Sequence, residues 1–575
     1  MAAFHVGPSR RAIPMSKDRM MQEEQAFDLV VVGSGAAGLT AAVVAAHHGL
    51  SVLVLEKAAR FGGTTARSGA VAWIPNNPHM APAGLPDSPE QADQYLRDLM
   101  GNYYDADKVC AFLRHGPDMI RMMEAHGAVR FDNWRSLDYE PWRKGAARGR
   151  SIGAAEFDGR RLGKYLPAIR PGLPNLTMLG GMQIGYADVA PFSAAFRDRA
   201  AFLYMAGKIG RYARDLLRHG RPTRLVGGNA LIGALLLTAL DKGVTLWRST
   251  PMVRLHREGD AVRGVTIGGD GGERLIAARR GVVLATGGYG GDDKMRRAFL
   301  PLADAGWSLQ PETNGGDGLR AGEQVGGHIV GDNIANAIWA ALSTMTDRRG
   351  RRLHHPHIFR DRAFPGFVLV DPQGRRFVNE GASYQDLGNV MIRKAIRSAW
   401  LICCHGALRT YGMGHVKPAP LPYQSYIRKG YLRTAATIPA LAEALAMEPA
   451  VLAATVERFN RFAREGHDPD FYKGQDGYTA EQGDPAHRPD PTLGPLEPGP
   501  FYAVEIRPGE FSTINGLETD ASARVLDAAG APIAGLYAVG VDSNSVFRGA
   551  YPGGGGSIGP AMTFGYIAAL HASDN

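Results

Sequence analysis

The sequence predicts an α/β fold in which an inserted α+β domain interrupts a Rossmann-type dinucleotide-binding domain. Three observations support this prediction: a complete βαβ pattern at residues 27–57, related strand and glycine patterns at 243–288 and 517–566, and shorter mixed elements with proline-rich joints between them. The 575 residues, 45% of them hydrophobic, suffice to bury the cores of two domains. The expected parts are residues 26–298 and 500–575 for the dinucleotide-binding domain, 299–499 for the catalytic and substrate domain, and 1–25 for a disordered leader.

The N-terminal pattern consists of a strand, a tight turn, a helix and a second strand. The first strand is apolar and β-branched, which is typical of a buried parallel strand. Gly33 permits the turn, Gly35 lets a pyrophosphate approach the backbone, and Gly38 lets the helix pack close to the sheet. The phosphates are expected at the helix N-terminus. The expected elements are strands at residues 29–32 and 51–55 and a helix at residues 39–48.

Two further features indicate which dinucleotide is bound. Glu56 ends the second strand about twenty residues after the glycines, where its carboxylate can accept hydrogen bonds from both ribose hydroxyls. A glycine and hydroxyl cluster, residues 60–70, follows directly and can place Thr64, Thr65 and Ser68 near phosphate or ring atoms. The βαβ motif alone does not separate NAD from FAD. The additional loop favours FAD, and the sequence lacks a second dinucleotide βαβ unit that would indicate NAD.

Three later glycine-rich turns are expected to complete the cofactor site. Residues 285–288 end a buried strand and residues 311–318 lead into a helix, so both bring backbone close to the cofactor. The turn at 548–556 precedes a helix at 557–571, whose N-terminus suits the N1 and C2 carbonyl edge of a reduced, anionic isoalloxazine. The expected cofactor contacts are Gly33, Gly35, Ala36, Ala37, Gly38, Glu56, Lys57, Gly63, Thr64, Thr65, Ser68, Gly69, Ala285, Gly287, Asp317, Gly540, Gly556, Ser557 and Ile558.

Composition and charge predict an enzyme that binds neither nucleic acid nor metal. The net charge is +9 and the pI is near 9.3, but the sequence has no lysine tract and no recognisable nucleic-acid module. Cys110, Cys403 and Cys404 have no metal-ligand spacing, and the C-x-x-C-H haem signature is absent. We therefore expect reduced thiols and a cytoplasmic protein. Neither a secretory signal nor a transmembrane segment is predicted.

Residues 196–221 form a basic stretch with helical spacing and two possible interpretations. One is a solvated helix with a packed apolar stripe. The other is a helix lying on a membrane surface, where an apolar substrate would be dissolved, which would make the protein peripheral at the inner membrane. The basic residues are Arg197, Arg199, Lys208, Arg211, Arg214 and Arg218, and the apolar ones are Phe202, Leu203, Tyr204, Met205, Ile209, Leu216 and Leu217.

The inserted part contains shorter elements. Residues 400–433 are expected to be loop-like, residues 438–464 helical, and residues 481–500 a proline-dense return linker. Earlier in the chain, residues 131–142 carry aromatics at irregular spacing. This pattern suits the wall of an apolar pocket and equally suits a loop pinned to a core.

Several motifs together resemble those of the 3-ketosteroid 1-dehydrogenases, members of the fumarate reductase and succinate dehydrogenase flavoprotein superfamily. The resemblance covers nearly the whole chain from Phe27 to His571. The Tyr551-Pro-Gly-Gly-Gly555 motif is the more specific one, whereas the cofactor motifs are superfamily-wide. The motifs are the βαβ unit, Gly62-Gly-Thr-Thr, Trp73-Ile-Pro-Asn-Asn-Pro, Ala285-Thr-Gly-Gly, Asn379-Glu-Gly-Ala-Ser-Tyr384 and Tyr551-Pro-Gly-Gly-Gly.

The resemblance implies roles for four residues. The Tyr551 hydroxyl and the Gly555 backbone amide would hold the 3-oxo group and acidify the neighbouring C2 proton. Tyr384 would remove that proton as phenolate while a hydride leaves C1 for flavin N5. Tyr139 would hydrogen-bond to Tyr384, because an unperturbed tyrosine titrates near 10 and needs help to act as a base. Competing candidates for this helper are Tyr103, Tyr104 and Tyr186.

The expected function is FAD-dependent 3-oxosteroid 1-dehydrogenation with noncovalent FAD. Alternatives are a 3-ketosteroid 4-dehydrogenase, a desaturase of another cyclic ketone, and, more remotely, a fumarate- or enoate-type reductase. The last is disfavoured because residues 510–516 lack the histidine that fumarate reductases place there, and no flavin-linking histidine lies in residues 64–70. The expected electron acceptor is a quinone or another soluble carrier.

Overall fold

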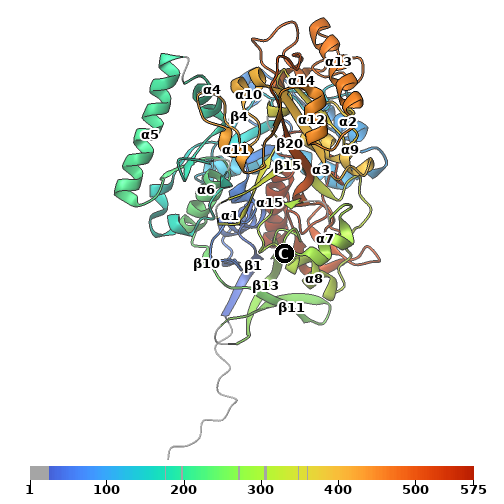
Figure 1. The fold of residues 1–575 in the computed structure, drawn as a ribbon. Helices are drawn as coiled ribbons and strands as arrows, with labels where there is room; N and C mark the ends of the chain where they lie inside the picture. Colours follow the sequence, from blue (N-terminus) through green and yellow to red (C-terminus); the bar gives the residue numbers. More distant parts are fainter. Residues whose placement is uncertain are drawn as a thin grey trace, which may run out of the picture.

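The computed structural model describes residues 25–174, 177–195, 198–269, 272–303, 307–347, 349–358 and 360–575 (Figure 1). The expected leader, 1–25, lies outside the described residues except for Gln25, which begins the first strand.

The first sheet carries the dinucleotide-binding motif and is parallel at its centre. Strand β1 pairs in parallel with β2 on one side and with β13 on the other, as expected for a βαβ unit buried on both faces. Its strands, in spatial order, are β10 (Thr245–Trp247), β2 (Val52–Leu55), β1 (Gln25–Val32), β13 (Arg274–Leu284), β12 (Ala261–Ile267), β22 (Pro532–Ala538) and β21 (Arg524–Leu526), with β11 (Met252–Glu258) paired to β12.

Two helices from opposite ends of the sequence lie together in the core of this part. Helix α1 (Ala36–His47) is buried through most of its length and packs against α15 (Ile558–Asp574). The approach is close, because a Cβ added to Gly565 would lie 2.5 Å from the Ala37 carbonyl oxygen. The C-terminal helix therefore shares one core with the N-terminal βαβ unit.

A second sheet forms the other half of the molecule. The long strand β20 (Phe501–Thr513) runs through it and pairs with four other strands. The expected boundary at residue 500 assigned this strand to the dinucleotide-binding domain, but its pairing places it in the second sheet, and the chain returns to the first sheet after Thr513. The spatial order is β16 (Arg352–Pro356), β15 (Ala337–Thr346), β20, β18 (Ala399–Cys404) and β17 (Phe367–Val370), with β14 (Trp307–Ser308) and β19 (Arg433–Ala435) on β20.

The helices beside the second sheet differ in part from the expectation. Residues 400–433 are not loop-like, because they contain part of β18, two helices and the start of β19. Their apolar side chains are buried against the sheet, and tertiary packing overrides the basic, proline-containing local sequence. The expected helical segment 438–464 is present as two helices. The helices of this part are α9 (Tyr384–Arg393), α10 (His405–Tyr411), α11 (Gln424–Arg428), α12 (Ile438–Ala444), α13 (Pro449–Glu465) and α14 (Gly477–Gln482).

Shorter sheets and further helices complete the fold. A three-stranded sheet consists of β3 (Val71–Trp73), β5 (Ser151–Ala154) and β4 (Phe131–Asn133), and β6 (Phe157–Asp158) pairs with β9 (Arg224–Leu225) and β7 (Thr177–Met178) with β8 (Met182–Gln183). The remaining helices are α2 (Pro89–Met100), α3 (Ala106–His126), α4 (Tyr186–Ala194), α5 (Arg199–His219), α6 (Gly227–Asp241), α7 (Asp293–Phe299) and α8 (Asp317–Gln324).

Helix α5 projects from the body of the molecule (Figure 1). Of the expected basic stretch, Phe196 and Arg197 lie outside the described residues. Leu203 is 60% exposed and Leu217 is 89% exposed. A solvated helix with a packed apolar stripe would bury these two side chains, so the structure does not match that interpretation at these positions. Within the described part of the chain, none of the helices combines the length and apolar character of a membrane span.

Candidate active site

The turn after β1 has the close contacts that the sequence predicts for a nucleotide-binding loop. Gly33 has a φ of +115°, and a Cβ there would lie 2.1 Å from the Ala285 carbonyl oxygen. A Cβ on Gly38 would lie 2.1 Å from the Gly33 carbonyl oxygen. Only glycine fits these positions, because side chains would collide with backbone. Gly35 precedes the first residue of α1 and leaves the helix N-terminus without a side-chain cap.

Glu56 lies at the end of β2 and is buried. Ser34 Oγ donates to Glu56 Oε2 over 2.5 Å, and the Ala58 backbone amide donates to Oε1 over 2.8 Å. Burial raises the pKa of Glu56, whereas the Ser34 and Ala58 hydrogen bonds lower it. The carboxyl is thereby oriented at the place where the sequence predicts the ribose of the dinucleotide.

The second glycine loop lies against the N-terminus of α1. Thr65 Oγ1 accepts a hydrogen bond from the Ala36 amide over 3.1 Å, so the loop and the helix share one surface. Ser68 Oγ instead donates to the Thr65 carbonyl oxygen and accepts from the Ala70 amide, which closes the turn that also contains Gly69. The space around a Cβ added to Gly63 is open within 4 Å. This loop therefore presents backbone groups and open space to a cofactor, whereas the hydroxyls of Thr65 and Ser68 are already hydrogen-bonded within the protein.

The turn after β13 meets the segment before α8. Asn314 Nδ2 donates to the Gly287 carbonyl oxygen over 2.7 Å and to Thr64 Oγ1 over 3.0 Å, so it ties two of the expected cofactor loops together. Lys57 and Asp317, both expected at the cofactor, form an ion pair of 2.5 Å with each other. Sequence reasoning did not single out Asn314, although it lies within the glycine-rich turn at 311–318.

A buried carboxyl holds the turn that follows Ala285. Asp542 accepts from the Thr286 amide over 2.5 Å, from the Thr286 hydroxyl over 3.0 Å and from the Gly288 amide over 3.1 Å. Burial raises the pKa of Asp542, and these hydrogen bonds oppose that shift. Asp542 was also missed by sequence reasoning; its one signal was its position two residues after Gly540, at the end of an expected strand.

The N-terminus of α15 closes the opposite side of the site. Gly555 has a φ of +96°, and its carbonyl oxygen accepts a hydrogen bond from the Trp73 amide over 3.1 Å. The N-cap residue Ser557 makes no side-chain capping bond, whereas the Gly559 amide in the first turn donates to the Gly555 carbonyl oxygen over 3.0 Å. Gly540 lies beside α1, where an added Cβ would be 3.1 Å from the Ala37 side chain.

Four tyrosines converge between the two sheets. The ring centroid of Tyr139 lies 5.7 Å from that of Tyr384, 5.9 Å from that of Tyr551 and 4.9 Å from that of Tyr478. The rings of Tyr384 and Tyr551 lie 5.6 Å apart. The three tyrosines with expected catalytic roles, Tyr139, Tyr384 and Tyr551, are thus brought together, and Tyr478 on α14 is an additional member that sequence reasoning missed.

The three tyrosines that compete with Tyr139 for the helper position lie away from Tyr384. Tyr103 donates a hydrogen bond to Asp332 and Tyr104 pairs with Asp93, whereas Tyr186 is 63% exposed and stacks on Trp134. Of the four candidates for the helper position, Tyr139 is therefore the one beside Tyr384.

The surroundings of the tyrosine hydroxyls keep them protonated. Burial raises the pKa of Tyr384 well above 10, and Tyr139 and Tyr551 raise it further. Burial also raises the pKa of Tyr551, but Tyr384, Ser557 and the Gly555 amide act in the opposite direction. The Gly555 amide thus lies within hydrogen-bonding reach of the Tyr551 oxygen.

Tyr384 is held by the segment that precedes it. It is the first residue of α9, whose N-cap Ser383 accepts from the Asp386 amide over 3.1 Å. The fully buried guanidinium of Arg362 donates to the Glu380 carbonyl oxygen over 2.5 Å and to the Ala382 carbonyl oxygen over 3.1 Å. Both sides of the turn before Tyr384 are therefore fixed.

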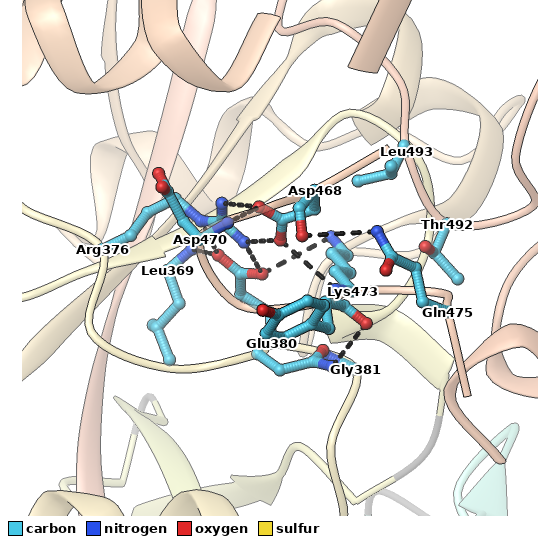
Figure 2. Close-up of polar contacts among 12 residues, drawn as sticks. Leu369, Arg376, Glu380, Gly381, Asp468, Asp470, Lys473, Gln475, Thr492 and Leu493 are labelled. Carbon is cyan, nitrogen blue, oxygen red and sulfur yellow. Dashed lines mark hydrogen bonds and ion pairs between the residues drawn. The ribbon is translucent and has the colours of Figure 1, made fainter. Parts of the chain in front are cut away.

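A buried network of charges lies beneath the same turn (Figure 2). Arg376 pairs with Glu380 over 2.8 Å and with Asp468 over 2.8 Å, and each of these side chains is at least 95% buried. Lys473 Nζ donates to the Phe367 carbonyl oxygen over 2.9 Å and lies 3.9 Å from Glu380. Because the charges are paired, this network can anchor the Glu380 turn in the interior.

The site fits FAD by two independent structural signs. Helices α1, α8 and α15 all begin at an N-cap residue without a side-chain capping bond, which suits phosphate or ring oxygens, although the Ala36 amide of α1 and the Gly318 amide of α8 each donate to a threonine hydroxyl. In addition, Thr513 Oγ1 is buried without a hydrogen-bond partner in the described chain, and it lines a cavity of about 30 Å³ together with Gly540, Gly556 and Ser557. A polar ligand at this position would satisfy it. The fold and site define a FAD-dependent oxidoreductase.

Comparison with known proteins agrees with this class. The FAD binding domain family model matches residues 28–558. The chain is 38% identical over 555 residues to a 4-oxocyclohex-2-ene-1-carboxylate 5-dehydrogenase of Sinomonas cyclohexanicum, covering 94% of this chain and 93% of the relative. It is 35% identical over 566 residues to a 3-oxosteroid 1-dehydrogenase of Mycolicibacterium smegmatis, covering 95% of this chain and 97% of the relative.

Among solved structures, the crystal structure of a 3-ketosteroid delta1-dehydrogenase from Sterolibacterium denitrificans in complex with 1,4-androstadiene-3,17-dione is similar with a TM-score of 0.88. It is 33% identical, with 96% of this chain and 100% of that chain covered. The protein belongs to the family of FAD-dependent dehydrogenases that includes the 3-oxosteroid 1-dehydrogenases.

Proposed function

We propose that this protein introduces a double bond next to the carbonyl group of a cyclic ketone, and that its substrate is a 3-ketosteroid dehydrogenated between C1 and C2. The observation that supports this most directly is the convergence of Tyr139, Tyr384 and Tyr551 at one place between the two sheets. The similarity to 3-oxosteroid 1-dehydrogenases at 35% identity supports the choice of ring and bond.

In this proposal, Tyr551 and Gly555 hold the ketone oxygen. The Tyr551 hydroxyl and the Gly555 amide would both donate hydrogen bonds to this oxygen and would polarise the carbonyl, so that the neighbouring C2 proton becomes acidic. Gly555 can approach closely because its left-handed backbone has no side chain to strain it.

Tyr384 is the proposed base at C2. It acts as phenolate, so its proton must first leave, and the adjacent Tyr139 is the proposed relay, which accepts that proton while its own hydroxyl proton passes on to solvent. Bound FAD supplies the two-electron oxidant that takes up the hydrogen from C1. The residues around the tyrosines include Ile338, Ile514 and Phe511, which suit an apolar ring system.

A second candidate within the same chemistry is a small cyclic ketone that carries a carboxylate. The similarity of 38% to a 4-oxocyclohex-2-ene-1-carboxylate dehydrogenase favours it. Both substrates need a ketone held by two donors and a base at the neighbouring carbon, so the tyrosine cluster serves either.

A 4-dehydrogenase would need the base over a different ring carbon. A fumarate-type reductase is disfavoured, because Glu510 at the start of the histidine-free segment 510–516 is buried in an ion pair of 2.9 Å with Arg296.

We further propose that α5 places the protein on a membrane surface. Phe202, Leu203, Leu216 and Leu217 are exposed, and the second pair follows the first after about four helical turns, which gathers them on one side of the helix. The exposed basic residues of the helix, such as Arg214 and Arg218, would meet anionic headgroups. Such a location would give access to a dissolved steroid and to a quinone as electron acceptor.

Anaerobic flavin absorbance tests the proposal. The FAD-loaded protein is mixed with a 4-ene-3-ketosteroid, a saturated 3-ketosteroid or 4-oxocyclohexanecarboxylate, and the products are identified by mass. Fast bleaching with the 4-ene-3-ketosteroid and loss of two hydrogens from ring A is expected. Bleaching by the carboxylate alone would transfer the assignment to the small ketones, and bleaching by the saturated steroid alone would transfer it to the 4-dehydrogenases.

A further inference from the structure

Lys108 is a buried lysine without a hydrogen-bond partner in the described part of the chain. It lies on the first turn of α3, and its side chain is only 3% exposed. The nearest carboxylate atom is Glu518 Oε1 at 3.6 Å, beyond hydrogen-bonding distance. A buried ammonium group costs several kcal/mol of solvation unless it is paired and hydrogen-bonded, so its surroundings require explanation.

Lys108 shares its nearest carboxylate with a second cation. Glu518 is shared with Arg548, whose guanidinium lies 3.3 Å from Glu518 Oε2. One carboxylate thus faces two cations at close range, and Asp105 at the N-cap of α3 is a further carboxylate that acts on Lys108. Such an arrangement favours an anion in the adjoining space.

The adjoining space is the cavity of about 30 Å³ that also receives the orphaned Thr513 hydroxyl. Lys108 lines it together with Ser557 at the N-terminus of α15 and Tyr551. Three features of one cavity therefore attract negative charge or hydrogen-bond acceptors: the ammonium group, the hydroxyl group and the positive end of the α15 dipole. Two of them are unsatisfied within the described protein.

We propose that Lys108 is a flavin-tuning residue, which donates a hydrogen bond to the N1 and C2 carbonyl edge of bound FAD and stabilises the negative charge of the reduced cofactor. The proposed hydrogen bond from Lys108 does not involve the substrate. The inference therefore rests on FAD binding and not on which ketone is oxidised. Burial lowers the pKa of Lys108 and Glu518 raises it. An anion in the cavity would act in the same direction as Glu518.

The reduction potential of the flavin in the absence of any ketone tests this inference. In Lys108→Met the equilibrium between reduced and oxidised FAD is expected to shift at least tenfold toward the oxidised form, which is about 30 mV for a two-electron couple. Sulfite, which adds to flavin as an anion, should bind at least tenfold more weakly to the same variant. Lys108→Arg retains the charge and should restore most of both properties.

Two further variants separate tuning from a merely structural role. Glu518→Gln removes the counter-charge and should shift the equilibrium in the opposite direction, toward reduced FAD. Lys473→Met is the matched control, because Lys473 is equally buried but lies in the charge network of Figure 2, away from the cavity. It should leave the potential of its bound flavin unchanged.

The inference is overturned if FAD-loaded Lys108→Met has the wild-type potential and sulfite affinity, or if Lys108→Met and Glu518→Gln shift the potential in the same direction. Should Lys108→Met not retain FAD, Lys108→Gln and Glu518→Gln provide the comparison. An unchanged potential in both would equally exclude a tuning role.

Discussion

The rings of Tyr139 and Tyr384 meet edge to face, with centroids 5.7 Å apart and an interplanar angle of 79°. Tyr139 comes from a loop after β4, whereas Tyr384 begins α9 beside the second sheet. Contact between them exists only because the two halves of the molecule close on each other. This contact is the physical basis for pairing a base with a second tyrosine, and it leads to the first prediction.

Tyr384→Phe should lower turnover by about 10² to 10⁴, the range for loss of a positioned general base, without loss of bound FAD. The phenyl ring preserves the packing against Tyr139 and Phe511. Stopped-flow bleaching with the ketone measures the chemical step, and flavin absorbance measures retention of FAD. The matched control is Tyr502→Phe, a buried tyrosine on β20 that contacts His405 and Tyr423. Near-normal bleaching in Tyr384→Phe would remove this residue from the role of base.

Tyr551→Phe should slow the same step by about 10² to 10³, because one of two carbonyl donors is lost. The Gly555 amide remains, so some activity is expected to persist. Rate constants at saturating ketone, compared with the apparent affinity, separate a loss in the transition state from weaker binding. Unchanged kinetics would mean that other groups hold the ketone oxygen.

Activity should increase with pH. Burial and the neighbouring tyrosines raise the pKa of Tyr384 well above 10, so the protonated phenol predominates below that value and the active phenolate is a minor form near pH 7. Each added pH unit then multiplies the phenolate fraction by about ten. The logarithm of the bleaching rate should rise with a slope near one between about pH 7 and about pH 9. A flat profile, with bleaching limited by chemistry, would contradict a phenolate base.

The stability of the protein should change with pH in the opposite direction to its activity. Because the pKa of Tyr384 is higher in the folded than in the unfolded protein, folding favours the neutral phenol. The contribution of Tyr384 to the free energy of unfolding is therefore complete at pH values below the unfolded-state pKa, near 10. It is lost as the pH rises through the folded-state pKa. Measurements at alkaline pH should therefore record rates before the protein unfolds.

Arg376→Met should destabilise the protein by about 3 to 5 kcal/mol, because it removes the cation hydrogen-bonded to buried Glu380 and Asp468 and leaves Glu380 only the more distant Lys473. The turn before Tyr384 should loosen, and turnover should fall with it. Urea unfolding followed by flavin release and circular dichroism measures the loss. Arg458→Met is the control, because its ion pair with Asp470 is largely exposed and should contribute about 1 kcal/mol or less. Equal effects of the two substitutions would refute the anchoring role of the network.

Substitution of Leu203 and Leu217 by Glu should reduce binding to anionic vesicles, since both side chains are exposed on α5. Co-sedimentation with phosphatidylglycerol vesicles measures the bound fraction, and turnover of a dissolved ketone should stay near wild type. Leu421→Glu changes an exposed leucine elsewhere and should not affect binding. If the wild-type protein does not bind vesicles but elutes as a dimer that these substitutions dissociate, α5 serves a second copy of the chain.

Local patterns in the sequence predicted the parts of the site that lie close together in the chain. The elements of the βαβ unit, the turn at Ala285 and the helix after Ser557 could be predicted because each depends on nearby glycines and apolar periodicity. The family resemblance supplied the roles of the tyrosines, which no local pattern encodes. The loop-like interpretation of residues 400–433 was wrong, because burial against β20 decided their structure.

The sequence by itself therefore determined the dinucleotide-binding motif and the choice of FAD, since these depend on backbone conformations that only particular residues near one another allow. Tertiary structure alone decided which of the tyrosines lies beside Tyr384, that Asn314 and Asp542 join separate cofactor loops, and that Lys108 lines the same cavity as Thr513. These contacts join segments far apart in the chain, and their existence depends on how two sheets pack, which is a property of the whole fold.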